Sequence, residues 1–184
     1  MRIIVVGPRG GGKSTLTKNI CQRFDIPRLE LDRLWFEAGG HECLISGCTN
    51  QEKQLVQDRI SKKVSDFLER NENWVVDGTS SKIRQTIAKN ADNIILIRRP
   101  LLTRLLSHVL RVIKSEDRHP ETKWWQDFMY TKVLVRRWWQ GERSELEEGL
   151  FPYRDKLITL KSFQEIDTYL NSLTTTQSGS KVSH

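Results

Sequence analysis

Short runs of aliphatic and β-branched residues recur along the chain, and most are followed at once by a glycine, an acid or a pair of arginines. The runs lie at Arg2–Val6, Arg28–Leu31, Trp74–Val76, Ile94–Ile97 and Lys156–Leu160. Continuous apolar runs of this length are typical of strands that are buried on both faces, as in a parallel sheet. We therefore expect five buried strands.

Apolar residues between these runs repeat at spacings of three and four, which predicts helices. One helix should begin at about Lys13 and carry Leu16, Ile20 and Phe24 on one face, with Pro27 beyond its end. Strands that alternate with helices favour an α/β protein with three layers, in which helices cover both faces of a parallel sheet.

Two further helix starts are marked by capping boxes, in which a Ser or Thr is followed three residues later by Glu. Thr49 and Glu52 open a predicted helix that runs to about Arg70. Ser162 and Glu165 have the same spacing before a predicted helix that reaches about Leu173.

The stretch from about residue 101 to 149 departs from the alternation of strands and helices. It is mostly helical in pattern, is interrupted by His119-Pro120, and contains Trp124, Trp125, Trp138 and Trp139 among basic residues. Such pairs favour a small hydrophobic core that holds a helical lid together, although aromatic and basic residues together can also stack nucleic-acid bases. We expect one domain over residues 1–173, with this lid, and a disordered tail over residues 174–184.

Charge and composition narrow the class of protein. The 184 residues carry a formal net charge of +7, which attracts nucleotides and nucleic acids alike. No apolar run approaches the roughly 20 residues that cross a bilayer, so no membrane partner is expected. Three cysteines in an unpaired pattern fit a reducing compartment, and no signal peptide is recognisable. We expect a cytoplasmic protein.

The first predicted strand runs directly into a glycine-rich segment. That segment matches the Walker A pattern G-x-x-x-x-G-K-[S/T] at every fixed position, with Gly7, Pro8, Arg9, Gly10, Gly11, Gly12, Lys13 and Ser14. In this motif the backbone amides surround phosphate oxygens, Lys13 reaches the β and γ phosphates, and the Ser14 hydroxyl binds Mg²⁺. Thr15 offers a second hydroxyl. The segment therefore predicts a site for ATP with magnesium.

Two aspartates follow the second and third predicted strands, at the edge of the sheet where ligands bind. Asp32 and Asp77 could hold magnesium, and either could orient the hydroxyl that accepts a phosphoryl group. Each also has an ordinary structural alternative. Asp32 could cap a helix that begins at Arg33, and Asp77-Gly78 could form a plain turn.

The order of these features resembles a known family. GPRGGGKSTL, IPRLELDRLWF, NWVVDGTSS, ADNIILIRRP and KLITLKSFQEIDTYL are similar, in order and spacing, to the adenylate-kinase-like DNA topology modulation proteins of the nucleoside and nucleotide kinase superfamily. The resemblance covers the chain to about Leu173. It implies a Rossmann-like P-loop NTPase fold with an arginine-bearing lid after the fourth strand.

The resemblance also implies roles for individual residues. Asp77 would help to organise magnesium and the acceptor, and Asp32 with Trp35, Gly78 and Arg84 would lie on the acceptor side. Arg111 would be a lid arginine that contacts phosphates. One departure concerns the fourth strand, which ends in the pair Arg98-Arg99 where relatives usually carry an acidic or apolar residue.

Arg104, His108 and Arg111 lie on one face of the predicted lid helix, so Arg104 could join Arg111 over the triphosphate, or it could be a solvated surface residue. Together these features predict a phosphotransferase that moves the γ-phosphoryl group of Mg-ATP to a small acceptor, with a nucleoside or nucleotide favoured. The alternative is a nucleic-acid-associated ATP-binding protein or ATPase in which the basic lid touches DNA or RNA. Steep salt dependence of polynucleotide binding would favour that alternative.

Overall fold

The computed structural model describes residues 1–8, 10–40, 48–78, 81–106 and 148–179. The strands in these ranges are β1 (Arg2–Val6), β2 (Arg28–Glu30), β3 (Trp74–Asp77), β4 (Asn93–Ile97) and β5 (Leu157–Leu160). The helices are α1 (Lys13–Phe24), α2 (Leu31–Glu37), α4 (Asn50–Arg70), α5 (Ser81–Asn90), the 3-10 helix η1 (Phe151–Lys156) and α9 (Phe163–Gly179). Residues 101–106 are also helical.

The five strands form one parallel sheet in the order β2-β3-β1-β4-β5. In the register of the sheet, Asp77 lies opposite both Val5 of β1 and Glu30 of β2. The predicted α/β fold, with a five-stranded parallel sheet covered by helices, is confirmed. Because all strands run the same way, the loop after β1 and the ends of β2, β3 and β4 meet at one edge of the sheet.

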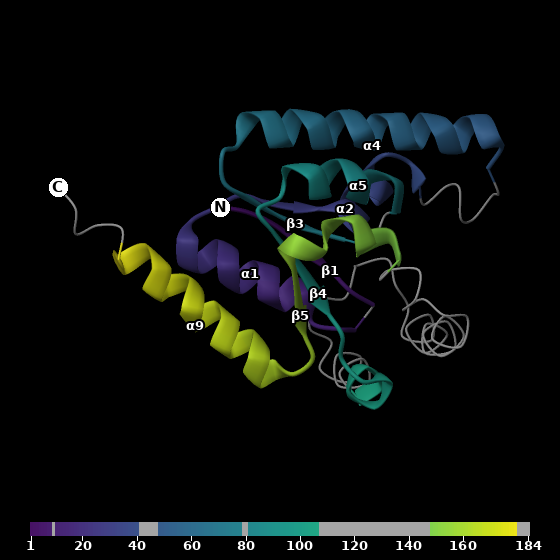
Figure 1. The fold of residues 1–184 in the computed structure, drawn as a ribbon. Coiled ribbons are helices and arrows are strands. Elements are labelled where there is room, and N and C mark those ends of the chain that lie inside the picture. The colour runs from purple at the N-terminus through teal and green to yellow at the C-terminus, as the bar shows by residue number, and fades with distance from the viewer. Residues whose placement is uncertain (9, 41–47, 79–80, 107–147, 180–184) are drawn as a thin grey trace.

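Helices cover both faces of the sheet (Figure 1). On one face α1 and α9 pack over alternate strand residues, in a core that includes Ile3, Val5, Val75, Ile95, Leu16, Ile20, Ile166 and Leu170. On the other face α2, α4 and α5 pack over the remaining strand residues, in a core that includes Ile4, Trp74, Val76, Leu96, Leu34, Ile60 and Ile87. The strict alternation of side chains along each strand divides the buried residues between two cores.

Both predicted helix caps are present. The hydroxyl of Thr49 accepts a hydrogen bond from the Glu52 amide at 3.3 Å, and the Thr49 amide donates to the Glu52 carboxylate at 2.8 Å. Hydrogen bonds to the carboxylate from the Thr49 amide and the Thr49 hydroxyl hold the pKa of Glu52 below its usual range. At the start of α9 the Glu165 amide donates to the Ser162 hydroxyl at 3.1 Å, while the Glu165 carboxylate accepts from the Lys161 amide at 2.7 Å.

Two element boundaries differ from expectation. Leu31 begins α2 instead of ending β2, with Glu30 in an extended conformation as the N-cap. Helix α9 continues beyond Leu173 to Gly179, because no proline or glycine interrupts the polar segment before that residue. The first part of the expected disordered tail is therefore helical, and residues 180–184 lie outside the described part of the chain.

The cysteines also differ from expectation. Cys48 is disulfide-bonded, so the prediction of three unpaired cysteines is wrong at this position. Cys21 in α1 is a free, half-buried thiol, and burial raises its pKa while the nearby Arg28 partly opposes that shift. Over the described ranges, no helix is both long enough and apolar enough to cross a membrane.

Candidate active site

The glycine-rich loop joins the end of β1 to the start of α1. Gly12 is the N-cap of α1, and no side chain caps the helix. The first amides of a helix have no partner within it, so they can donate to phosphate oxygens, and the helix dipole adds positive potential there. Within the loop the Gly11 amide donates to the Pro8 carbonyl at 3.2 Å, which closes a tight turn.

Lys13 lies across this loop. Its ammonium donates to the Pro8 carbonyl oxygen at 3.2 Å, and its side chain is buried. The two hydroxyl-bearing residues that follow, Ser14 and Thr15, are exposed in the first turn of α1. The arrangement therefore places a cation, uncapped amides and a solvent-facing hydroxyl within one short segment. Arg9 lies outside the described residues.

The loop is seated directly on the end of β4. A Cβ at Gly7, where φ is +150°, would stand 2.7 Å from the carbonyl oxygen of Ile97, so only glycine allows this approach. Gly11 also packs against Ile97, because its Cβ position is 3.4 Å from the Ile97 side chain. The segment that follows β4 is thereby held against the loop.

Two buried arginines from that segment flank the loop. A guanidinium nitrogen of Arg99 lies 3.7 Å from the Cβ position of Gly12, and the same guanidinium stacks on the Phe163 ring at 3.7 Å from its centroid. Burial lowers the pKa of Arg99, although an arginine stays charged in proteins. The backbone carbonyl oxygen of Arg104 lies 3.3 Å from the Cβ position of Gly10.

One of these two arginines belongs to the predicted lid. Arg104, predicted to face either the triphosphate or solvent, is 4% exposed and therefore is not a solvated surface residue. Arg111 and the four tryptophans of the predicted lid lie outside the described residues. Arg99 was not among the predicted site residues. Its only signal in the sequence was the unusual basic pair at the end of the fourth strand.

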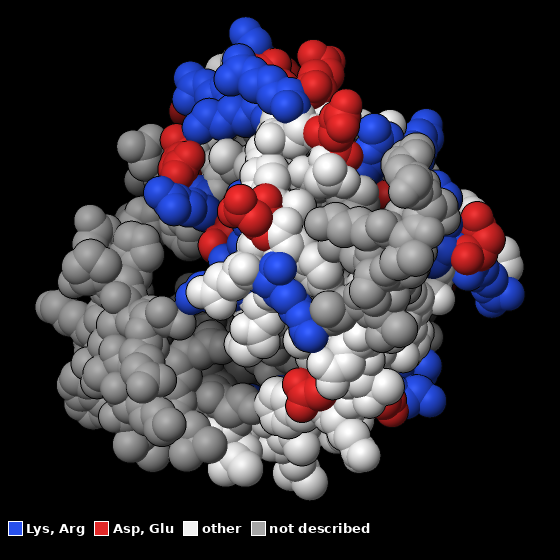
Figure 2. All heavy atoms as spheres, turned by 90° about the vertical axis from the view of Figure 1, so that its left-hand side faces the viewer, with Lys and Arg blue, Asp and Glu red and all other residues white. Residues whose placement is uncertain are grey.

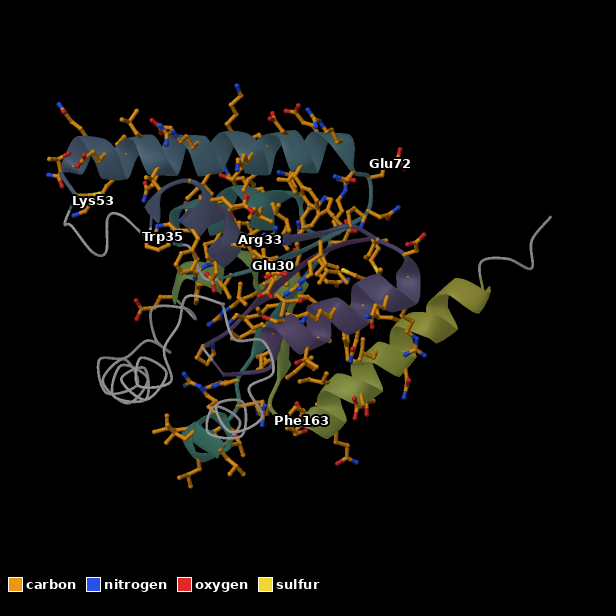
Figure 3. All side chains as sticks on the ribbon, turned by 180° about the vertical axis from the view of Figure 1, so that it is seen from behind. Glu30, Arg33, Trp35, Lys53, Glu72 and Phe163 are labelled. Carbon is orange, nitrogen blue, oxygen red and sulfur yellow. The ribbon has the colours of Figure 1, made fainter. Side chains whose placement is uncertain are left out.

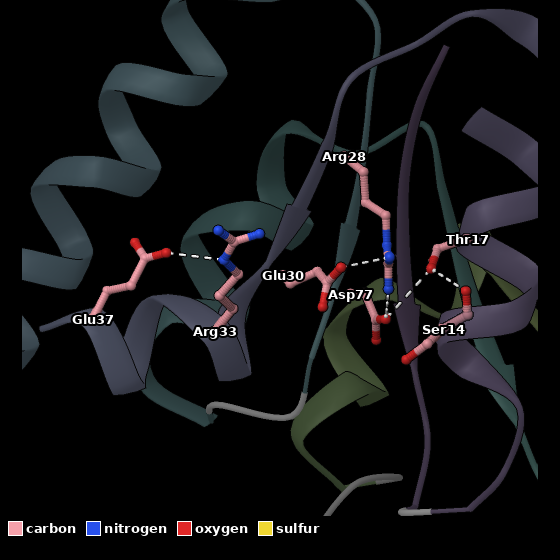
Figure 4. A network of polar contacts seen from close by, with 7 residues as sticks. All are labelled: Ser14, Thr17, Arg28, Glu30, Arg33, Glu37 and Asp77. Carbon is pink, nitrogen blue, oxygen red and sulfur yellow. Dashed lines mark hydrogen bonds and ion pairs between the residues drawn. The ribbon is translucent and has the colours of Figure 1, made fainter. Parts of the chain in front are cut away.

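Asp77 is the last residue of β3 and is buried beneath α1. Its Oδ2 atom accepts hydrogen bonds from the Arg28 guanidinium at 2.7 Å and from the Thr17 hydroxyl at 3.3 Å. The Thr17 hydroxyl also contacts the Ser14 carbonyl at 3.1 Å, and the Ser14 side chain points toward Asp77 (Figure 4). The structure thus places Ser14 near Asp77, two of the three residues predicted to hold magnesium, and adds Arg28, which the sequence did not indicate.

Gly78 follows Asp77 and touches the start of α2. Its φ is +151°, and a Cβ there would lie 2.5 Å from the Cβ atom of Leu31. The Gly78 amide approaches the Val5 carbonyl oxygen at 3.5 Å. A side chain at this position would push the end of β3 away from α2, so the glycine is required by packing.

Asp32 lies in the first turn of α2 and is exposed. The predicted alternative, in which it caps a helix beginning at Arg33, is not observed because Glu30 is the N-cap. Trp35, one turn further on, is half-buried against the core and packs edge-on to Phe36 at 5.3 Å. Figure 3 shows Trp35 on α2, well away from Phe163 at the start of α9. The predicted acceptor residues therefore lie apart from the Arg99 side of the loop.

Arg84, the remaining residue predicted for the acceptor side, is in α5 and is 5% exposed. One of its guanidinium nitrogens lies 3.2 Å from the Cβ position of Gly149. A basic group buried at this depth needs compensating interactions, and Arg84 does have at least one further interaction. Arg84 is therefore an internal residue and not a surface arginine.

The side-chain oxygens near the loop suit a magnesium ion that is bound together with a nucleotide. Among the described residues, no group of three or more His, Cys, Asp or Glu could hold a metal ion by itself. Mg²⁺ is commonly bound by one or two protein oxygens together with substrate phosphates and water. The Ser14 hydroxyl and the Asp77 carboxylate provide oxygens of this kind, so these residues fit such an ion.

Comparisons with known proteins bear on the fold. A family model described as an AAA domain matches residues 3–93, a range that contains the glycine-rich loop, Asp32 and Asp77. No curated protein matches the chain.

Three solved structures share its architecture at low identity. TT1252 from Thermus thermophilus is 14% identical, with a TM-score of 0.56 over 100% of this chain and 98% of the other. Shikimate kinase from Bacteroides thetaiotaomicron is 13% identical, with a TM-score of 0.56 over 97% and 98%. Shikimate kinase from Acinetobacter baumannii in complex with shikimate is 14% identical, with a TM-score of 0.55 over 99% and 95%.

The sheet, the loop and these likenesses define the class: the chain has the fold of P-loop kinase-like NTPases. The finer resemblance to DNA topology modulation proteins is not addressed by the matches and stays a prediction. At this level of identity a likeness speaks for the fold, and the reaction has to be argued from the site itself.

Proposed function

We propose that this protein is an ATP-dependent phosphotransferase that moves the γ-phosphoryl group of Mg-ATP to a small acceptor. The observation that carries the proposal is the uncapped start of α1 at Gly12, with the Lys13 ammonium across the loop and the buried Asp77 carboxylate close by. A helix start of this kind binds anions, and the carboxylate provides an oxygen for the accompanying cation.

Phosphoryl transfer depends mainly on alignment and on neutralising charge, and the residues around the loop suit both tasks. Lys13 and the loop amides would hold the β and γ phosphates, while Ser14 and Asp77 would hold magnesium. Magnesium held there would supply positive charge to neutralise the charge that develops on the transferred group. The Arg99 guanidinium adds a buried positive charge beside the loop, which favours binding of a polyanion.

The acceptor would lie at the end of β2. Asp32 is exposed there and could orient an acceptor hydroxyl and take its proton, with Trp35 and Arg84 as further candidates. A nucleoside or nucleotide remains our favoured acceptor class. Because two of the similar structures are named as shikimate kinases, shikimate and other small alcohols belong in the same screen.

The alternative of a nucleic-acid-associated ATPase rests on the net charge of +7 and on the basic predicted lid, most of which lies outside the described residues. On the face shown in Figure 2, basic and acidic side chains of the described residues are interspersed, without a continuous basic stripe. A polynucleotide would need such a stripe to follow its phosphates. We favour the small-molecule reaction because the loop, Lys13 and Asp77 form a site suited to it, and steep salt dependence of polynucleotide binding would speak for the alternative.

The test is a phosphoryl-transfer screen with γ-labelled ATP against nucleosides, nucleotides, shikimate and other small alcohols. We expect Lys13→Ala to lower kcat on the best acceptor by about 100-fold or more, because an electrostatic contact to the transferred group is removed. The matched control is Lys53→Ala, an exposed lysine of α4, which should keep its activity. Unchanged transfer by Lys13→Ala, or no binding of Mg-nucleotide by the wild-type protein in calorimetry, would contradict the proposal.

A further inference from the structure

Arg28 has a position that phosphate binding alone does not explain. It is the first residue of β2 and stands between two carboxylates, 2.7 Å from Asp77 and 2.5 Å from Glu30 (Figure 4). The Arg28 and Asp77 side chains are 13% and 7% exposed, whereas Glu30 is 42% exposed. Arg28 therefore forms a nearly buried ion pair with Asp77 and a more solvent-exposed ion pair with Glu30.

The arrangement follows from the sheet. Residues two apart on a strand share a face, so Arg28 and Glu30 point the same way. Asp77 lies opposite Glu30 in the parallel register, and Thr17 of α1 covers the same spot from above. Because β2 is at the edge of the sheet, its arginine can reach under α1 without displacing a neighbouring strand.

The ion pair with Arg28 weakens the attraction of the Asp77 carboxylate for a cation. A single carboxylate oxygen, Oδ2, already accepts from both Arg28 and Thr17, which leaves the other oxygen for water or metal. The guanidinium balances the charge of the carboxylate, and it would repel a divalent ion bound at the Ser14 hydroxyl. A bare cation is therefore attracted less strongly here than it would be by an unpaired Asp77, until the nucleotide brings its own negative phosphates.

We propose that Arg28 is a positioning residue that neutralises Asp77 and thereby makes divalent-cation binding depend on bound nucleotide. The inference rests on the proposed function in that Asp77 is taken to face the metal. It adds to that function a reason why the metal enters as a complex with the nucleotide and not before it.

The experiment measures binding of Mn²⁺ alone, without nucleotide, by the electron paramagnetic resonance signal of the free ion. We expect Arg28→Gln to bind Mn²⁺ at least tenfold more tightly than the wild-type protein, since it removes the resident positive charge. The matched variant Arg28→Lys keeps that charge and should resemble the wild type. Arg28→Gln combined with Asp77→Asn should lose the gain. An unchanged affinity in Arg28→Gln, or a gain that survives Asp77→Asn, would overturn the inference.

Arg28→Gln leaves a buried carboxylate with one partner fewer and could fail to fold, which circular dichroism would report. In that event Glu30→Gln provides the test, because it removes the half-exposed carboxylate and leaves the charge of Arg28 less compensated. With ADP bound, the Mg²⁺ concentration for half-saturation should then rise several-fold in calorimetry. A constant or lower concentration would refute the proposed role of Arg28.

The binding measurements also distinguish failure of this inference from failure of the proposed function. A wild-type protein that binds no nucleotide would remove the proposed function, while the measurements with Mn²⁺ alone would still decide whether Arg28 opposes a cation at Asp77. A wild-type protein that binds Mg-ADP, together with an Arg28→Gln variant that gains no Mn²⁺ affinity, would remove only the inference.

Discussion

The ends of β2 and β3 lie side by side in the sheet, yet their aspartates have different surroundings. Asp77 ends β3, is buried, and accepts hydrogen bonds from Arg28 and Thr17. Asp32 lies one residue into α2 and is exposed. The difference arises because β3 has a strand on both sides and α1 above it, whereas β2 is an edge strand that turns at once into a helix.

The comparison teaches that neighbouring strand ends can serve separate purposes. A buried, paired carboxylate is fixed in place and suits a metal that must be held in one geometry. An exposed carboxylate can meet a diffusing acceptor and exchange a proton with it. Substitutions at the two positions should therefore affect different quantities.

The largest expected effect on stability is that of Asp77→Asn. Removing one partner of a buried ion pair leaves Arg28 with only the half-exposed Glu30, and it should lower the free energy of unfolding by about 3 kcal/mol. Urea unfolding would measure this. The control is Asp58→Asn, an exposed residue of α4, for which a change within about 0.5 kcal/mol is expected. Equal stability of the two variants would show that the pair with Arg28 contributes little.

Asp32→Asn should act on the reaction. If Asp32 takes the proton of the acceptor, kcat should fall by about 100-fold, or about 2.7 kcal/mol in barrier height. The unfolding free energy should change by less than about 1 kcal/mol, because Asp32 is exposed and contributes only a charge in the first turn of α2. Transfer kinetics and urea unfolding on the same preparation would test both statements. A stability loss as large as that of Asp77→Asn would remove the distinction between the two strand ends.

Tyr169→Phe extends the comparison to a polar group that is buried but, among the described residues, has no hydrogen-bond partner. The Tyr169 hydroxyl in α9 is buried and has no hydrogen-bond partner among the described residues, and burial raises its pKa to about 12. The phenylalanine variant should be more stable by about 1 kcal/mol at neutral pH. A less stable variant in urea unfolding would show that the hydroxyl has a favourable contact.

The pH dependence of the same variant has a definite sign. Between an unfolded pKa near 10 and the folded value of about 12, the folded protein keeps the phenolic proton that the unfolded chain has lost. The wild type should therefore lose stability as pH rises through this interval, and Tyr169→Phe should lack this part of the loss. A constant difference between the two proteins from pH 8 to pH 11 would contradict the assignment.

Local pattern was enough to predict much of the fold. The five strands, the loop at Gly7 to Ser14 and both capped helices depend on residues close together in the sequence, and all were expected. Leu31 was assigned to the wrong element because an apolar residue after a short strand fits a strand and a buried helix start equally well. Leu31 packs against the backbone of Gly78, and that contact is not visible in a local pattern.

The parts of the site that escaped prediction are pairings between distant residues. Arg28 looks like an ordinary charged residue at the start of an edge strand, and its partner Asp77 is 49 positions away. Arg99 appeared only as an unusual basic residue, and its stacking on Phe163 joins the ends of two different strands. Charge and spacing reveal which groups are present, whereas partner choice depends on strand order and on which face each side chain occupies.

The contact between Gly78 and Leu31 joins the two strand ends compared above. Since the Gly78 backbone at the end of β3 rests directly on the Leu31 side chain at the start of α2, the contact limits how closely the two strand ends that carry the aspartates can approach each other. Residue 78 can therefore not vary independently of residue 31. Any alteration that enlarges either one would change the gap between the two carboxylates before it touched either of them.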